Sequence, residues 1–279
     1  LNRNINMGND VFFHAEPSGE MDERLLDEPA SRSIVRGVEW IMEGFFLFRE
    51  YPLSWMRIAF ILLACEWALT SLAQHLFIAG LVLLAIYMLF KAGGLLMAAS
   101  IQEHEERPPG IGQMFLILEG KVFEFILLLI LLFFAAAAWG YLLYGIAGAL
   151  GLWNPLSGMA DIFMFLLWFL TVQQLLGFAP VLVFIQDETP MAAIIQSVKA
   201  SFKNILPLTL SAITQGLLMA AAFWLLGRLL GNIPGKAVTY IFVAVWLFFS
   251  MVSYLTTYAA YRDIWFEPIE SDGIQTGYR

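Results

Sequence analysis

A few charged residues in this chain stand within or beside long apolar runs, and they are the side chains best placed to do chemistry. They are Arg57, Glu66, Lys91, Glu119 and Glu124. A charge in the apolar interior of a membrane costs about 3 kcal/mol unless it pairs with another charge or reaches water. The five residues therefore form a candidate lipid-binding or ion-pair site.

The relative depths of these charges depend on how the first two apolar runs fold back on each other. If the turn lies at His75, Lys91 comes near the level of Arg57, and Glu66 lies roughly two helical turns further from the chain ends. Two cations at one level would hold a lipid phosphate, or would pair with Glu119 and Glu124 at the next run. Alternatively, both side chains extend to the membrane surface and need no ligand, or they belong to a transport site.

Motifs of known catalytic chemistry do not occur in the sequence. The histidines His14, His75 and His104 each lack a second His or Cys at the spacing of a zinc site. There is no GxSxG motif for a serine nucleophile and no glycine-rich nucleotide loop. His104 stands among glutamates, which is typical of a solvated acidic loop. We therefore expect no catalytic, cofactor-binding or metal-binding residues, and a protein that is not an enzyme.

Composition identifies the elements that must position the charges. Apolar residues make up 60% of the chain and charged residues only 14%. In soluble domains about a quarter of all residues are charged. The apolar runs are continuous and long enough to cross a bilayer as helices. We predict six spans, at Leu53–Ala73, Phe77–Ser100, Val122–Tyr144, Ala160–Ile185, Leu208–Leu230 and Ala237–Tyr261.

A short pattern that occurs twice predicts an internal repeat. FREYPLSW from Phe48 and FKNILPLTL from Phe202 each end an amphipathic segment and begin an apolar run. In the first segment, Ser31 to Glu50, one face of a helical wheel is apolar and the opposite face is charged; the apolar face consists of Ile34, Val38, Ile41, Phe45 and Phe48, and the charged face of Arg32, Arg36, Glu39, Glu43 and Glu50. This pattern is typical of a helix that lies at the membrane surface.

The second segment, Met191 to Lys203, has a similar apolar face, formed by Met191, Ile194, Val198 and Phe202, and Ile111 to Lys121 is a weaker third copy. We therefore predict an all-α, polytopic membrane helical bundle of six transmembrane helices in three hairpin repeats, each preceded by an interfacial amphipathic helix. The repeats cover about 34–109, 110–190 and 191–267. Residues 1–30, which lack the order of a cleaved signal peptide, and residues 268–279 are predicted to be cytoplasmic tails, the first of them flexible.

The distribution of Lys and Arg predicts the orientation in the membrane. Most of these cations fall on the side that holds both termini, and the opposite loops contain only Arg228 and Lys236. Because Lys and Arg remain cytoplasmic during insertion, both termini should be cytoplasmic. The net charge of −8 makes nucleic acid an unsuitable partner.

Two segments carry a resemblance to known proteins. GFAPVLVFIQDETPMAAIIQSVKASFKNILPL from Gly177 and YAAYRDIW from Tyr258 resemble a family of uncharacterised bacterial inner-membrane proteins, which share a P-x-x-A-hydrophobic-x-x-S…K-N-x-x-P core and a terminal Y-R-D-I/V. The similarity extends over most of the chain after Ser31. A looser likeness is to YciC-like proteins and to the membrane domain attached to some glycerophosphodiester phosphodiesterases. The resemblance implies a six-helix protein of the bacterial inner membrane without an established activity, and it transfers no catalytic residues.

Three classes of function remain open at this point. The first is a non-enzymatic accessory membrane protein that interacts with lipids, anionic ones included, or docks a protein partner or a second copy of itself. The second is a small transporter or lipid-moving protein with a hydrated cavity between the repeats that contains Glu66 or Lys91. The third is a membrane enzyme with an unrecognised site. The lack of catalytic motifs favours the first class.

The predicted topology can be tested with reporter fusions. Alkaline phosphatase fused at Trp153, in a loop on the predicted periplasmic side, should be active, because the enzyme requires the oxidising periplasm. The same reporter fused at Glu188 should be inactive. Activity at Glu188 without activity at Trp153 would contradict the orientation.

Overall fold

The computed structural model describes residues 23–151, 158–230 and 236–268. The predictions made for residues 1–22 and 269–279, for His14 and for the loop at Trp153 fall outside these ranges. The described chain is all-α apart from two short strands, and it contains six helices long and apolar enough to cross a membrane. The predicted fold class is therefore confirmed, and the chain is a multi-pass helical membrane protein.

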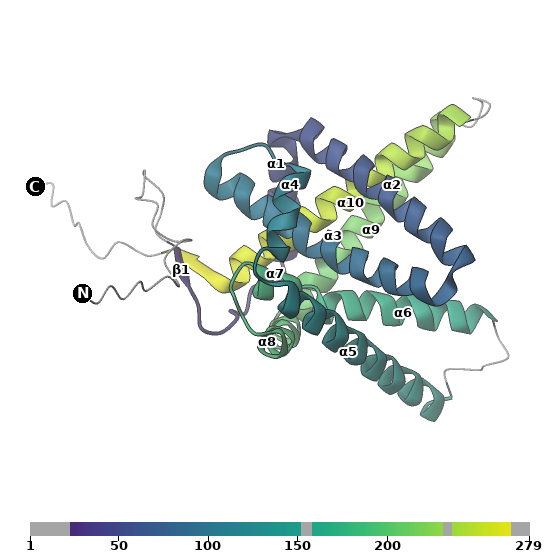
Figure 1. Ribbon diagram of the computed structural model, residues 1–279. Coiled ribbons are helices and arrows are strands. Elements are labelled where there is room, and N and C mark those ends of the chain that lie inside the picture. Colours follow the sequence, from purple (N-terminus) through teal and green to yellow (C-terminus); the bar gives the residue numbers. More distant parts are fainter. Residues whose placement is uncertain (1–22, 152–157, 231–235, 269–279) are drawn as a thin grey trace, which may run out of the picture.

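The long helices form three hairpins that all extend away from the described chain ends (Figure 1). The first hairpin is α2 and α3, the second is α5 and α6 with its short continuation α7, and the third is α9 and α10; their bounds are α2 Pro52–His75, α3 Phe77–Glu105, α5 Val122–Ala149, α6 Gly158–Leu176, α7 Ala179–Phe184, α9 Ile205–Leu230 and α10 Lys236–Trp265.

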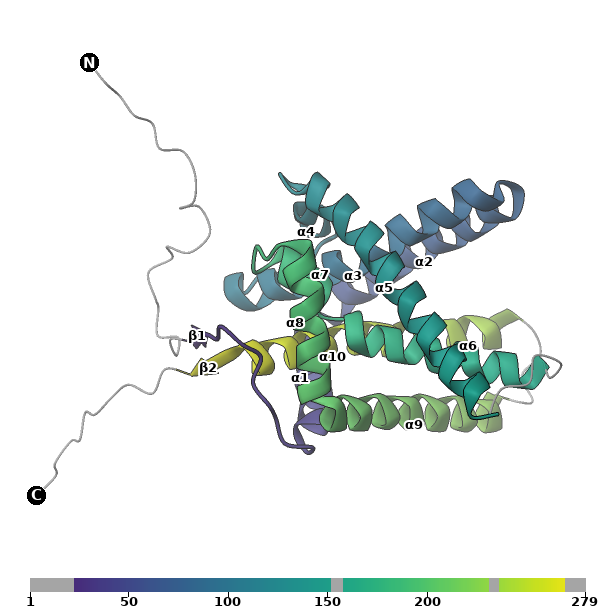
Figure 2. The ribbon, with the colours of Figure 1, turned by 90° about the horizontal axis from the view of Figure 1, so that it is seen from below.

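A short helical element precedes each hairpin. These elements are α1 Arg36–Glu50, then α4 Ile111–Met114 with the 3₁₀ helix η1 Phe115–Leu118, and finally α8 Pro190–Lys203. Figure 2 shows α8 running across the long helices rather than along them. The strands β1 Glu23–Leu25 and β2 Phe266–Pro268 pair antiparallel at the chain ends.

Prolines set several of the helix boundaries. Pro52 begins α2 directly after α1, and Pro190 begins α8 behind Thr189, whose hydroxyl accepts a hydrogen bond from the Ala192 backbone N–H. A proline suits the first turn because its missing N–H would have no intrahelical partner there. Helix α3 ends at Glu105, and the next residue, Glu106, takes a left-handed conformation shortly before a pair of prolines.

Helix α1 is packed into the protein rather than lying only on a membrane surface. Its buried strip contains Gly37, Trp40 and Gly44, which face α9 and α10. A side chain at either glycine would collide with backbone: a Cβ on Gly37 would lie 2.2 Å from the Pro207 carbonyl oxygen. The close approach of the helices therefore depends on these glycines.

The predicted apolar face of α1 is consequently divided between two environments. Ile41 and Phe48 are buried inside the protein, whereas Ile34 and Phe45 are exposed. Large apolar side chains define the face predicted from the sequence, whereas the closest helix contacts are made at the small residues, the glycines. The face of α8 is divided in the same way, with Ile194 buried and Phe202 exposed.

The fourth span, predicted as one helix over Ala160–Ile185, is interrupted at Gly177, between α6 and α7. Pro180 has no N–H to donate to the carbonyl four residues earlier, so the helical hydrogen bonds cannot continue. Hydroxyls of α8 supply the missing partners: Ser201 Oγ donates to the Gln174 carbonyl at 2.6 Å, and Ser197 Oγ donates to the Leu175 carbonyl at 2.8 Å. The break is therefore stabilised by side chains of the neighbouring helix, as apolar surroundings require.

The segment before α1 differs from its prediction as part of a flexible tail. Residues 23–30 are bonded to the end of α10, with Leu26 N–H donating to the Trp265 carbonyl and Ala30 N–H to the Ile264 carbonyl, both at 2.9 Å. The local composition of this segment is that of a flexible tail. Its bonding partners lie more than 230 residues away in the sequence, so the composition of a short stretch cannot reveal them.

The packing of α1 on α10 predicts opposite effects of one substitution at two helical glycines. A Cβ on Gly44 would lie 2.6 Å from the Thr256 nitrogen, whereas a Cβ on Gly216 in α9 meets open space. Gly44→Ala should therefore lower the free energy of unfolding by about 1–3 kcal/mol. Gly216→Ala should be neutral or stabilise by up to about 1 kcal/mol. Unfolding of both variants in detergent micelles, followed by tryptophan fluorescence, measures the difference, and equal effects would argue against the close contact.

Candidate functional site

The structure brings two of the five candidate residues together. Lys91 Nζ lies 2.9 Å from Glu66 Oε2, and the ammonium group also lies 5.9 Å from the centre of the Tyr254 ring on α10. Lys91 is almost completely buried, with 7% of its surface exposed. The ion pair links α2 to α3 within the first hairpin.

This pairing corrects the depths expected from the sequence, which placed Lys91 level with Arg57 and two turns away from Glu66. Counting residues on each side of the turn at His75 gives the depths of the backbone positions only. The side chains lie elsewhere, because Cβ atoms tilt toward the N-terminus of their own helix. On the descending α2 and the returning α3, this tilt directs the Glu66 and Lys91 side chains toward each other. Their length covers the remaining difference.

The other three candidate residues remain separate. Arg57 is exposed on α2, Glu119 is exposed after η1, and Glu124 is partly exposed in the first turn of α5. Within the described ranges, none of the three side chains makes a hydrogen bond or ion pair. Lys121, close by in sequence, instead pairs with Asp187 and donates to the carbonyls of Val183 and Phe184.

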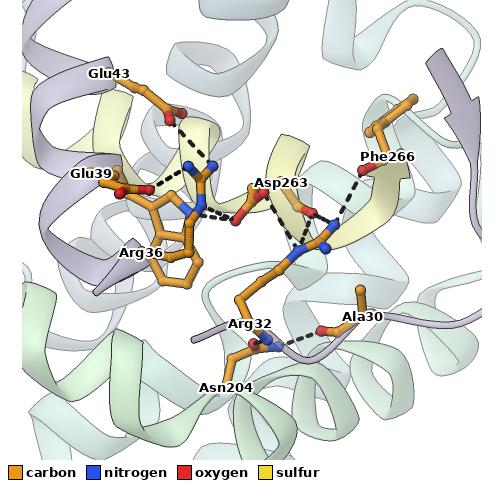
Figure 3. Close-up of polar contacts among 9 residues, drawn as sticks. Ala30, Arg32, Arg36, Glu39, Glu43, Asn204, Asp263 and Phe266 are labelled. Atoms are coloured by element: carbon orange, nitrogen blue, oxygen red, sulfur yellow. Dashed lines mark hydrogen bonds and ion pairs between the residues drawn. The ribbon is translucent and has the colours of Figure 1, made fainter. Parts of the chain in front are cut away.

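A second polar cluster, which the sequence did not single out, surrounds Asp263 at the end of α10 (Figure 3). Asp263 Oδ2 accepts hydrogen bonds from Arg36 Nε and from Trp40 Nε1, both at 2.9 Å. Its Oδ1 lies 3.4 Å from Arg32 Nε, and Arg32 Nε also donates to the Asp263 carbonyl at 2.8 Å. The hydrogen bond to Asp263 raises the pKa of Arg36 above its usual value. We call these four residues the Asp263 cluster.

Asn204, at the junction of α8 and α9, extends this cluster to a third part of the chain. Its Oδ1 accepts from the Arg32 backbone N–H at 2.8 Å, and its Nδ2 donates to the Ala30 carbonyl at 2.8 Å. Asn204 is completely buried, so its amide satisfies backbone groups that would otherwise lack partners. Arg32 and Arg36 belong to the predicted charged face of the amphipathic segment, and both side chains bind Asp263 of α10.

A polar groove of about 390 Å³ lies beside the Asp263 cluster, between α1 and the ends of α3 and α10. Glu103 pairs there with Arg262 and accepts a hydrogen bond from Tyr258 Oη at 2.7 Å. Glu43 lies in the wall, and burial raises its pKa. Most charges of the groove are thus bonded to one another, which indicates a structural network more than a reactive site.

A second groove, of about 310 Å³, is apolar and lies between α5, α6 and α8. Its wall includes Ala138 and Trp139 of α5, Leu175 of α6, and Val198 and Phe202 of α8. In the part of the chain that the structure describes, no group of three or more His, Cys, Asp or Glu side chains is arranged to hold a metal ion.

Comparison with protein-family models, with curated proteins and with solved structures finds no match to this chain. The fold and the sites therefore define a class and no more: a multi-pass membrane protein with six candidate spans in three hairpins, a buried ion pair within the first hairpin, and a polar cluster at the chain ends.

The ion pair predicts strong coupling between Glu66 and Lys91. Lys91→Met leaves the Glu66 carboxylate without its partner, and we expect a loss of about 3 kcal/mol in the free energy of unfolding. Glu66→Leu should cost a similar amount, because the Lys91 ammonium is then left buried and unpaired. The double variant should recover most of the loss. Unfolding of all four proteins in one detergent gives the coupling energy, and additive losses would show that the two charges act independently.

Proposed function

We propose that this protein is a non-enzymatic accessory protein of the bacterial inner membrane that binds anionic lipids, with both termini in the cytoplasm. The observation that carries the proposal is the position of Arg57. This residue lies about one and a half turns from the start of α2. Its side chain is exposed and has no bonded partner among the described residues.

An anion at this position would stabilise the guanidinium group of Arg57. Arg57 is surrounded on α2 by exposed apolar side chains, those of Leu53, Phe60 and Ile61, which belong to the acyl region of a bilayer. A guanidinium so close to the acyl region is stabilised by a phosphate, which it binds with two parallel hydrogen bonds. The phosphate of a membrane lipid is the anion available at that depth. Lys91, for which a lipid phosphate was one of the alternatives, is neutralised by Glu66.

The apolar surface of the hairpins supports an extensive contact with lipid. In α5 and in α9, only 11% of the helix's most apolar stretch is buried inside the protein, compared with 44% in α3. Such surfaces need a cover of acyl chains, of a protein partner or of a second copy of the chain. Lipid is the cover that the exposed Arg57 favours.

The cytoplasmic location of the termini is supported by the arrangement of the chain. The strands β1 and β2 join the first and last described residues, and the three hairpins extend to the opposite side (Figure 1). Most of the Lys and Arg residues fall in the tails and loops on the side of the spans that holds both termini, and such residues remain cytoplasmic during insertion. The resemblance of the segments from Gly177 and Tyr258 to bacterial inner-membrane proteins supports the choice of membrane.

Transport is less well supported than lipid binding. A transport site would need Glu66 or Lys91 in a hydrated cavity. The two residues are bonded to each other, and neither is part of the wall of the two grooves described above.

Native mass spectrometry tests the proposal through lipids that remain bound during purification. Arg57→Gln should lower the occupancy of phosphatidylglycerol or cardiolipin about fivefold, since one cation near the surface contributes about 1 kcal/mol. Arg107→Gln serves as the control, because Arg107 is an exposed loop residue paired with Glu105. Equal lipid occupancy in the two variants would refute a phosphate site at Arg57. A stable complex with another protein in place of lipid would favour partner docking.

A further inference from the structure

The apolar groove between α5, α6 and α8 shares helix α8 with a pair of cations. Val198 and Phe202 of α8 form part of its wall, and the next residue in each case is a lysine, Lys199 and Lys203. The two lysines are four residues apart and therefore lie on one strip of α8, beside the strip that forms the wall. A molecule with an apolar chain and an anionic head would contact both strips at once.

The two lysines already hold an anion, which the chain itself supplies. The Glu28 carboxylate lies 2.6 Å from Lys199 Nζ and 3.5 Å from Lys203 Nζ. The hydrogen bond from Lys199 lowers the pKa of Glu28, so the carboxyl group is ionised at neutral pH. Glu28 thus occupies the position that a phosphate would take between the two ammonium groups.

The contact is open to exchange with another anion. The Glu28 side chain is 62% exposed and each lysine side chain is 38% exposed. Exposed ion pairs of this kind are weak because water and salt screen them. The backbone around Glu28 is held by the pairing of β1 with β2, by Asn204 and by a hydrogen bond of 3.0 Å from Lys203 Nζ to the Pro29 carbonyl. The first two of these contacts do not involve the lysines, so the Glu28 side chain can move while this backbone stays in place.

We propose that the apolar groove binds one acyl chain of an anionic phospholipid, whose phosphate is held by Lys199 and Lys203 in competition with Glu28. This inference rests on the lipid-binding function proposed above and adds a second site, on α8 rather than on α2. A phospholipid fits because it has both an apolar chain and a phosphate, whereas a soluble anion would use only the lysines. The groove volume of about 310 Å³ is at the lower end of the range for small-molecule sites, as expected for part of one chain.

Photolabelling with lipids tests the proposal on the full chain. The protein is placed in phosphatidylcholine nanodiscs that contain phosphatidylglycerol with a photoreactive group in one acyl chain, and labelled peptides are identified by mass spectrometry. We expect labelling of α8 and of the facing parts of α5 and α6. Phosphatidylcholine with the same photoreactive chain should label these peptides several-fold less.

Two sets of variants separate the head-group contact from general damage to the fold. The double variant Lys199→Gln/Lys203→Gln should reduce phosphatidylglycerol labelling at α8 about fivefold or more, whereas Glu28→Gln should raise it about two- to fivefold. The double lysine variant and Glu28→Gln break the same ion pairs. If only the loss of these pairs mattered, both variants would change phosphatidylglycerol labelling in the same direction. Ala138→Phe should fill the groove and lower labelling, and Ala137→Phe, an exposed neighbour outside the groove wall, is the matched control.

Equal labelling by the two lipids, or unchanged labelling in the double lysine variant, would overturn the phosphate site. Unchanged labelling in Glu28→Gln would overturn the competition, and equal labelling in the two alanine variants would overturn the groove. The Arg57 site is read separately, from lipid retention in Arg57→Gln, so the α8 site can fail while the proposed function stands. If the wild-type protein retains and labels no anionic lipid at all, both proposals fail.

Discussion

The carboxylate of Asp263 is the side-chain contact that joins α1 and the segment before it to the end of α10. It binds Arg36 and Trp40 of α1 and Arg32 of the preceding segment, so it fixes the position of α1 across α10. The close approach at Gly44 and the contact of Gly37 with α9 both follow from that position. One acidic group on the last span thereby determines where the first helix lies, and from there where α2 begins.

A second constraint is the need to satisfy backbone hydrogen bonds in apolar surroundings. At Gly177 the helical hydrogen bonds stop, and the hydroxyls of Ser197 and Ser201 replace them. Lys121 serves the same purpose for the carbonyls at the end of α7. The buried face of α8, with its small residues, is thus specialised for its neighbour, while its opposite face carries Lys199 and Lys203.

The sequence predicted features that arise from local composition. The six apolar runs, for example, are confirmed as six long helices, because run length and hydropathy act on each helix separately. Glu66 and Lys91 were both named as candidates for an ion pair, but that they pair with each other was not predicted, because this depends on how side chains lean on two antiparallel helices. The Asp263 cluster was missed as well, although Asp263 and Asn204 stand in the YRDI and KN-x-x-P patterns. Those patterns marked the residues without showing that Arg32 and Arg36, far earlier in the chain, are their partners.

The contact between the two chain ends has a consequence for synthesis. Arg32 precedes Asp263 by 231 residues, and at about 5–20 residues per second the ribosome needs roughly 10 to 45 s to produce the partner. During this interval α1 has been made but cannot dock, while the hairpins enter the bilayer one after another. The exposed apolar residues of α1 allow the helix to wait on the membrane surface, and its closure against α10 completes assembly only after the last hairpin has been inserted.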